Sequence, residues 1–221
     1  MPKTADPSVR TALLEAAADL IATGGSATLT LRRLAEEVGT STMAIYTHFG
    51  GMQNLRQEIR REGFDRLREH LESVRPSSDP LADVARLGWA YYDNAVENPN
   101  LYRVMFLDHH EPAEDIVGLD TFARLVAGVA ECVDGGRFDQ AEPFDLALQL
   151  WAAVHGLVTL QLSGLIDAPL VVEALDTTWR NLFVGFGADR KTVGRSLTRA
   201  RRADGRVAPR RALHRGLGSA G

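Results

Sequence analysis

The sequence predicts an all-α protein, with an N-terminal three-helix helix-turn-helix domain followed by a larger C-terminal helical bundle. Three observations support this prediction. Apolar residues recur every three or four positions along nearly the whole chain. Glycine and proline pairs separate the periodic segments. No segment shows the alternation of apolar and polar residues that is typical of strands.

The N-terminal helices are delimited by capping residues. A first helix is expected to end at Gly24-Gly25. Thr30 and Ser41 are favourable N-caps for two short helices, and Gly39 between them tolerates the positive φ of a tight turn. Apolar spacing predicts a longer fourth helix over 52–74.

The rest of the chain reads as further helices, which the spacing predicts at roughly 80–97, 99–107, 115–133, 142–164 and 168–186. We therefore divide the chain into a helix-turn-helix domain (1–52), a C-terminal domain (53–189) and a basic tail (190–221). The tail is poor in large apolar residues, so we expect it to be flexible or a loose helix.

Charge is distributed unevenly along the chain. Residues 71–189 carry 6 basic and 19 acidic side chains, whereas residues 190–221 carry 10 basic side chains and one acidic. The acidic middle would be repelled by a polyanion, so only the two ends are candidates for contact with nucleic acid. A single cysteine, Cys132, and the lack of an apolar leader or an apolar run of membrane-spanning length predict a cytoplasmic protein.

The segment from Thr28 to Leu55 carries the clearest functional signal. In its second short helix Ile45 and Phe49 are expected to point inward, which leaves the other face exposed. The hydroxyls on that face can reach phosphate or base edges, Met43 can contact a thymine methyl, and His48 can donate to a phosphate. The outward residues are Thr42, Met43, Tyr46 and Thr47.

This segment resembles the DNA-binding domain of the TetR family of bacterial transcriptional regulators. The family pattern appears as Thr30-Leu-Arg-Arg-Leu-Ala35, then Gly39 and Ser41, then Ile45-Tyr-Thr-His-Phe49. The resemblance implies contacts of Thr30, Tyr46 and His48 with phosphates, of Thr47 with bases or the sugar-phosphate backbone, and a position at the start of the recognition helix for Ser41, Thr42 and Met43.

One position departs from the family pattern. Met52 stands where the family often has a lysine that anchors a phosphate. Backbone N–H groups at the start of that helix can still bind phosphate, and Arg10, Lys3 or the basic tail are candidates to compensate.

The C-terminal half also resembles one TetR subgroup, through its Trp151-x-x-x-His155-Gly156 signature. The resemblance implies that helices 142–164 and 168–186 form a four-helix interface with a second subunit, and that a small-molecule cavity lies in this half. Each candidate for the cavity, taken alone, is more often an ordinary core residue. The candidate ligand-binding residues are Trp89, Tyr92, Met105, Phe106, Phe122, Trp151 and His155.

These observations predict a homodimeric repressor that is released from a palindromic double-stranded DNA operator by a small-molecule inducer of unknown identity. We expect no cofactor, no metal, no membrane association and no enzymatic activity, since the sequence lacks the common catalytic motifs. The alternative, favoured by Met52, is a helical module that binds a small molecule or a partner and has lost operator binding.

Overall fold

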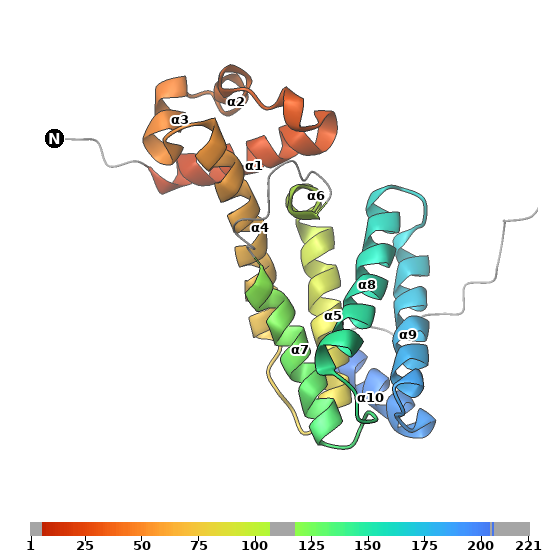
Figure 1. Ribbon diagram of the computed structural model, residues 1–221. Coiled ribbons are helices and arrows are strands. Elements are labelled where there is room, and N and C mark those ends of the chain that lie inside the picture. Colours follow the sequence, from red (N-terminus) through yellow and green to blue (C-terminus); the bar gives the residue numbers. More distant parts are fainter. Residues whose placement is uncertain (1–5, 107–117, 204, 206–221) are drawn as a thin grey trace, which may run out of the picture. The chain divides into compact units, whose positions relative to one another are not determined.

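The computed structural model describes residues 6–106, 118–203 and 205, and within these ranges all regular structure is helical, which confirms the all-α prediction (Figure 1). The helix bounds lie close to those expected from apolar spacing. The helices are α1 (Pro7–Gly24), the short 3-10 helix η1 (Ser26–Thr28), α2 (Leu31–Val38), α3 (Thr42–Phe49), α4 (Met52–Ser73), α5 (Pro80–Glu97), α6 (Pro99–Phe106), α7 (Leu119–Asp134), α8 (Pro143–Leu162), α9 (Ala168–Gly185) and α10 (Arg190–Ala203).

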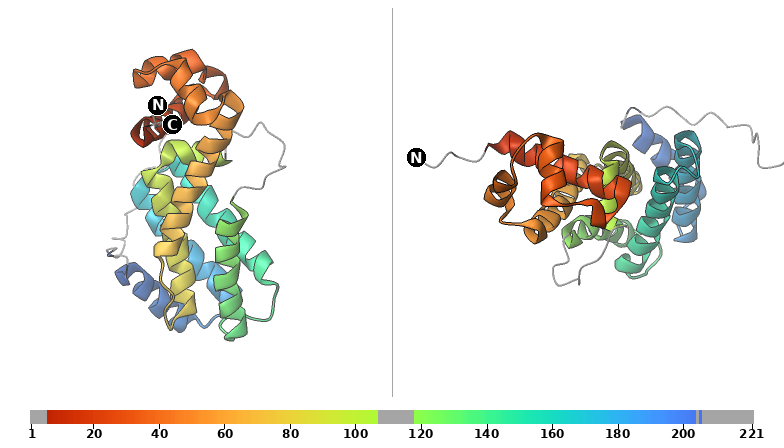
Figure 2. Two further views of the ribbon diagram at one scale, coloured as in Figure 1. Left: turned by 90° about the vertical axis from the view of Figure 1, so that its left-hand side faces the viewer. Right: turned by 90° about the horizontal axis from the view of Figure 1, so that it is seen from above.

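The chain forms two compact units, and each can be followed in Figure 2. The N-terminal unit contains residues up to Glu69 together with 97–121. The C-terminal unit contains 70–96 and the residues from Phe122 onward. This division does not coincide with the expected boundary after residue 52, because most of α4 and all of α6 belong to the N-terminal unit.

The N-terminal unit is built around one apolar core. Asp6 caps α1 by accepting the Ser8 N–H at 2.9 Å, and Pro7 takes the first helical position, where its missing N–H costs nothing. The fully buried Leu13, Leu34 and Ile45 come from α1, α2 and α3 respectively. These three helices therefore share one hydrophobic centre.

Helix α6 belongs to this same core. Its Leu101 and Val104 lie in the apolar cluster that contains Leu13. Gly63 of α4 allows α6 to approach closely, since a Cβ atom there would lie 2.5 Å from the Met105 sulfur. Arg66 of α4 fastens the start of α6 by donating to Asn98 Oδ1 at 2.8 Å.

The C-terminal unit is a bundle in which α5 is almost wholly buried. Trp89 of α5 is 1% exposed and packs edge-to-face on Trp179 of α9, with ring centroids 4.9 Å apart. Gly88 leaves room for this contact, because a side chain there would collide with the Trp179 ring. Helices α8 and α9 lie side by side in this unit (Figure 1).

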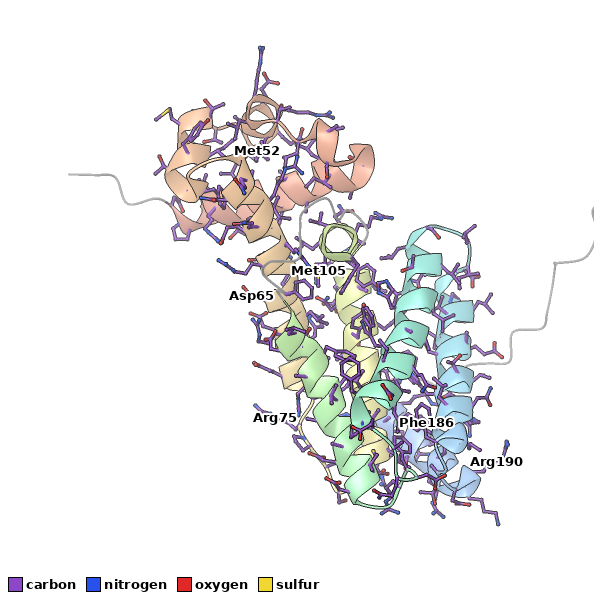
Figure 3. The ribbon with its side chains drawn as sticks, viewed as in Figure 1. Met52, Asp65, Arg75, Met105, Phe186 and Arg190 are labelled. Carbon is purple, nitrogen blue, oxygen red and sulfur yellow. The ribbon has the colours of Figure 1, made fainter. Side chains whose placement is uncertain are left out.

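Residues 190–203 of the expected tail form a helix, which is one of the two expected forms, but this helix is packed and not loose. These residues form α10, which begins at Arg190 (Figure 3) and buries Val193, Leu197 and Ala200. Small and branched apolar residues at helical spacing are sufficient for one packed stripe, and ion pairs to acidic residues of the same unit add to it. Residues 206–221 of the expected tail lie outside the described residues.

Candidate nucleic-acid interface and ligand region

Helix α2 has a cap at each end. Thr30 Oγ1 accepts the Arg33 N–H at 3.2 Å and so begins α2. Gly39 ends α2 in the left-handed conformation, with φ 69° and ψ 35°. This conformation is strained for residues with a side chain, which explains the glycine.

Helix α3 has a buried face and an exposed face. Ser41 Oγ accepts the Ala44 N–H at 3.2 Å and begins the helix, and Gly50 ends it with φ 74°. Ile45 and Phe49 are buried, as the spacing predicts. The opposite face presents Met43, 69% exposed, and Tyr46, 49% exposed. Thr42 and Thr47 are also exposed, and His48 is half-buried in the last turn.

The hydroxyl groups of this surface differ in whether their proton is available to an external acceptor. Thr30 and Ser41 use an oxygen lone pair to cap a helix, so each keeps its O–H for an external acceptor. Thr47 instead donates its proton to the Met43 carbonyl at 2.8 Å. A phosphate oxygen only accepts hydrogen bonds, so it has no bond to gain from Thr47 while this contact is kept.

Helix α4 begins shortly after α3 in the sequence, and its first residue is Met52 in place of the expected lysine. Met52 (Figure 3) packs partly buried against the core of the N-terminal unit. Gln53 and Asn54, which follow it, are exposed in the first helical turn. The backbone N–H groups of a first turn lack intrahelical partners and attract anions.

Two arginines change which basic side chains can compensate for the missing lysine at position 52. Arg10 forms an ion pair with Glu58 and lies 5.6 Å above the Phe49 ring, so its side chain is engaged within the unit. Arg33 was missed by sequence reasoning. It is exposed in the first turn of α2, opposite the buried Leu34-Ala35 side, and helical periodicity could have identified it. Lys3 lies outside the described residues.

In the C-terminal unit, two of the candidate ligand residues are core residues. Trp89 is enclosed between rings, with Tyr92 at 5.9 Å on one edge in addition to Trp179. Tyr92 is buried, and its hydroxyl donates to Gln161 Oε1 at 3.0 Å.

Phe122, Trp151 and His155 form a half-buried row of rings. The Trp151 centroid lies 6.0 Å from Phe122 and 5.1 Å from His155. Burial lowers the pKa of His155, because the charged imidazolium loses its hydration. The Tyr91 hydroxyl lies 2.9 Å from His155 Nδ1, and the neutral ring can accept a hydrogen bond from it.

Sequence reasoning missed two polar groups beside this row. Tyr91 lies buried in α5, and its sequence neighbourhood does not distinguish it from a core residue. Thr159 follows His155 by one helical turn, and its hydroxyl oxygen is buried without a hydrogen-bond partner among the described residues. The period of four from Trp151 through His155 to Thr159 could have indicated this residue.

The remaining two candidates, Met105 and Phe106, belong to the N-terminal unit. Met105 is buried against Gly63, and the Phe106 ring lies 5.6 Å from Phe64. The seven candidates are thus divided between the two units.

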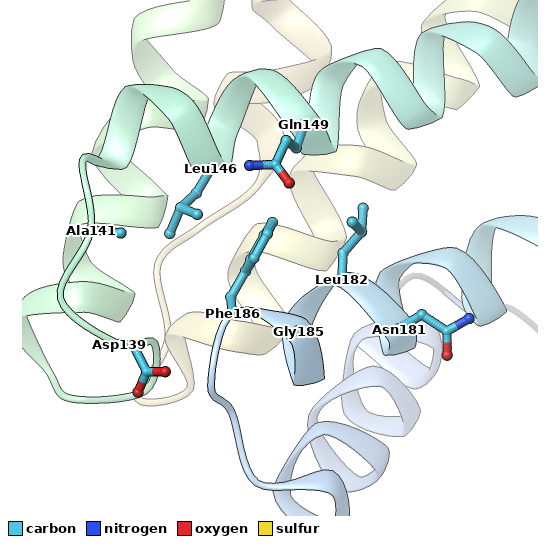
Figure 4. A pocket seen from close by; sticks show the side chains of 8 residues that line it. All are labelled: Asp139, Ala141, Leu146, Gln149, Asn181, Leu182, Gly185 and Phe186. Carbon is cyan, nitrogen blue, oxygen red and sulfur yellow. The ribbon is translucent and has the colours of Figure 1, made fainter.

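The C-terminal unit also contains an open hollow of about 370 Å³, formed by α8, α9 and the segment preceding α8 (Figure 4). None of the seven candidate ligand residues lines it. Its wall contains both polar and apolar residues. They are Asp139, Ala141, Leu146, Gln149, Asn181, Leu182, Gly185 and Phe186.

Taken together, the capped α2–turn–α3 arrangement and the exposed face of α3 define a helix-turn-helix DNA-binding protein. Residues 13–59 match the model of the bacterial regulatory proteins of the tetR family, and residues 84–184 match the model of the tetracyclin repressor-like C-terminal domain. The chain belongs to the TetR family and is a transcriptional regulator; its relatives are DNA-binding regulators and not enzymes.

Similar proteins extend over most of the chain. An uncharacterized HTH-type transcriptional regulator, Rv0681 of Mycobacterium tuberculosis, is 26% identical over 161 residues, which is 72% of each chain. A solved structure of a protein of unknown function from Rhodococcus sp. RHA1 is 26% identical, with a TM-score of 0.68, covering 84% of this chain and 99% of that one. The TetR family protein CprB of S. coelicolor A3(2) shares the fold at 19% identity, with a TM-score of 0.70, covering 90% and 98%.

Proposed function

We propose that the chain is a cytoplasmic, homodimeric repressor that holds a palindromic operator through α3 and releases it when a small molecule binds. The observation that carries this proposal is the surface around α3. Two capping hydroxyls keep a proton for phosphate, and an exposed helix face lies between them and the start of α4. Such a surface fits a major groove with its flanking phosphates.

Each candidate DNA residue has a role in this proposal. Thr30 and Ser41 donate to phosphates from the ends of α2 and α3, while the exposed hydroxyls of Thr42 and Tyr46 provide further donors. His48 donates a ring N–H to a phosphate of the DNA backbone. Met43 and Thr47 face the bases.

Dimerisation is supported by the apolar surface of α8. By length and composition this helix could cross a membrane, with mean hydropathy 1.2, yet only 28% of that window is buried in the single chain. Phe144 is 54% exposed and Leu148 is 42% exposed. Membership of a family of DNA-binding regulators favours a second copy of the chain, and not lipid, as the cover for this face.

We assign the C-terminal unit to the Trp-x-x-x-His-Gly subgroup, with its ligand near the row of Phe122, Trp151 and His155. The stacked rings and the Tyr91 hydroxyl on His155 supply apolar area together with a polar group. Gly156 is exposed, and a Cβ there would meet nothing within 4 Å in the single chain, so this side of α8 is open to a partner helix.

The rival function is a helical binding module that has lost its operator, and Met52 is the observation that favours it. In the structure Met52 helps to build the core beneath the recognition surface. The substitution therefore removes a charge while the exposed first turn of α4 is retained. This arrangement favours weaker phosphate anchoring over a loss of DNA binding.

The test is salt-dependent binding of the full chain to the DNA upstream of its own gene, measured by fluorescence anisotropy. Tyr46→Phe and Thr42→Val each remove one hydroxyl donor, and we expect each to weaken binding about tenfold. Thr23→Val, an exposed threonine near the end of α1, is the matched control and should bind like wild type. A wild-type protein that binds all sequences equally at low salt would favour the rival function.

A further inference from the structure

The exposed face of α3 lacks the side chains that usually read purines. Its outward residues are Thr42, Met43, Tyr46 and Thr47. Guanine is most often recognised by arginine or lysine, and adenine by asparagine or glutamine, through paired hydrogen bonds in the major groove. The His48 ring is half-buried in the last turn, whereas base contacts come mainly from the first turns of a recognition helix.

What this face offers instead is an apolar strip. Met43 is the most exposed large apolar side chain of α3, at 69%. Thr47 follows it by four residues, so the two side chains lie on the same side of the helix. The Thr47 proton is committed to the Met43 carbonyl at 2.8 Å. Thr47 therefore presents its methyl group and an oxygen that can only accept.

The edge of a base pair in the major groove carries one apolar group, the C5-methyl of thymine. We infer that α3 selects its operator through contacts of Met43 and the Thr47 methyl with thymine methyl groups. The half-site then has T·A pairs at the positions that face these two residues. This inference rests on the proposed function, because it requires α3 to lie in the major groove.

The experiment begins by selecting duplexes from a random library with the full-length protein. Each enriched thymine is then replaced by uracil, which removes only the methyl group. Burial of one methyl contributes about 0.8 kcal/mol, so we expect roughly fourfold weaker binding for each contacted thymine. In Met43→Ala, thymine and uracil should bind alike at one position of each half-site, while the other thymines keep their effect.

Thr47 offers a matched pair of variants. Thr47→Val keeps a methyl and removes the hydroxyl, whereas Thr47→Ser keeps the hydroxyl and removes the methyl. We expect the valine variant to retain the preference for thymine over uracil and the serine variant to lose it at one position. The opposite result would assign readout to the hydroxyl and overturn the inference. Far-UV circular dichroism checks that each variant is folded.

The thymine contacts and the proposed function can fail separately. An enriched sequence that binds equally well with uracil at every position would overturn the inference and leave the proposed function standing. A selection that enriches no sequence would overturn the proposed function, and the inference with it.

Discussion

Helices α3 and α8 both expose apolar side chains, but their surroundings differ. On α3, Met43 and Tyr46 lie among hydroxyl groups and near the N-terminal ends of helices. On α8, Phe144 and Leu148 are followed along the same face by Ala152 and Gly156, which add no polar side chain. Exposed apolar area alone therefore does not identify the partner.

The polar groups at the border of each face distinguish the two. Hydroxyls with a free proton suit a phosphate backbone, which accepts hydrogen bonds. A long stripe without such donors suits another protein surface of the same kind, as in a two-fold dimer. We therefore expect a charge on α8 to abolish dimerisation, whereas a charge on α3 should lower DNA affinity and leave the dimer intact.

The largest effect is expected from Leu148→Glu on α8. A two-fold interface repeats the change in both subunits, so two unpaired carboxylates would be buried in the interface. We expect a monomer at micromolar concentration in sedimentation experiments. Operator affinity should fall roughly 100-fold, because two linked recognition helices bind far more tightly than one.

Val96→Glu is the matched control, since Val96 is 41% exposed against 42% for Leu148 but lies on α5. It should remain dimeric and bind DNA like wild type. A Leu148→Glu protein that stays dimeric would show that the exposed face of α8 is not the subunit interface.

Helix α10 contrasts with α3 and α8, because it directs a charged side chain into its own unit. Arg201 donates to Asp176 at 2.6 Å, and both side chains are 12% exposed. Arg201→Ala should lower the free energy of unfolding by about 2 kcal/mol, because it leaves Asp176 with only part of its compensation. The exposed neighbour Arg202→Ala should change it by less than about 0.5 kcal/mol. Equal values in urea unfolding would show that α10 is not held by this pair.

A smaller effect separates the two roles of Ser41. Ser41→Ala removes the N-cap of α3 and should cost about 1 kcal/mol of stability. Ser41→Asp keeps the cap but brings a negative charge to the phosphates, so stability should stay near wild type while DNA affinity falls about tenfold. Ser41→Asn keeps both the cap and a donor and should retain both properties. An aspartate variant that binds DNA normally would remove Ser41 from the interface.

The helix-turn-helix could be predicted from the sequence because its determinants are local. Thr30, Gly39 and Ser41 act on residues within a few positions of themselves, and the structure places each cap and turn where the spacing indicated. The inward positions Ile45 and Phe49 follow from helical periodicity in the same way. The DNA contacts themselves stay a prediction.

The packing of α10 and the surroundings of the candidate ligand residues depend on long-range contacts that helical spacing does not encode. The polar contacts that add to the packing of α10 include Asp79, which lies 117 residues before its partner Ser196. The partnership of Tyr91 with His155 spans 64 residues. Residue type is the signal behind the candidate ligand residues, and type does not distinguish Trp89, enclosed by two rings, from Trp151, which is half-buried.

The smallest expected effect concerns His155 and the pH dependence of stability. Burial lowers its pKa in the folded protein below the ordinary value of 6.5, so the unfolded chain binds more protons as the pH falls through this range. Above pH 6.5 the ring is mostly neutral in both states, so its titration leaves the free energy of unfolding unchanged. This free energy decreases as the pH falls from 6.5 through the folded pKa. His155→Gln cannot titrate, so urea unfolding between pH 7.5 and 5 should show a steeper loss for wild type than for the variant. Identical slopes would mean that the ring is hydrated, which would weaken its assignment to a buried ligand region and leave α3 as the better defined of the two sites.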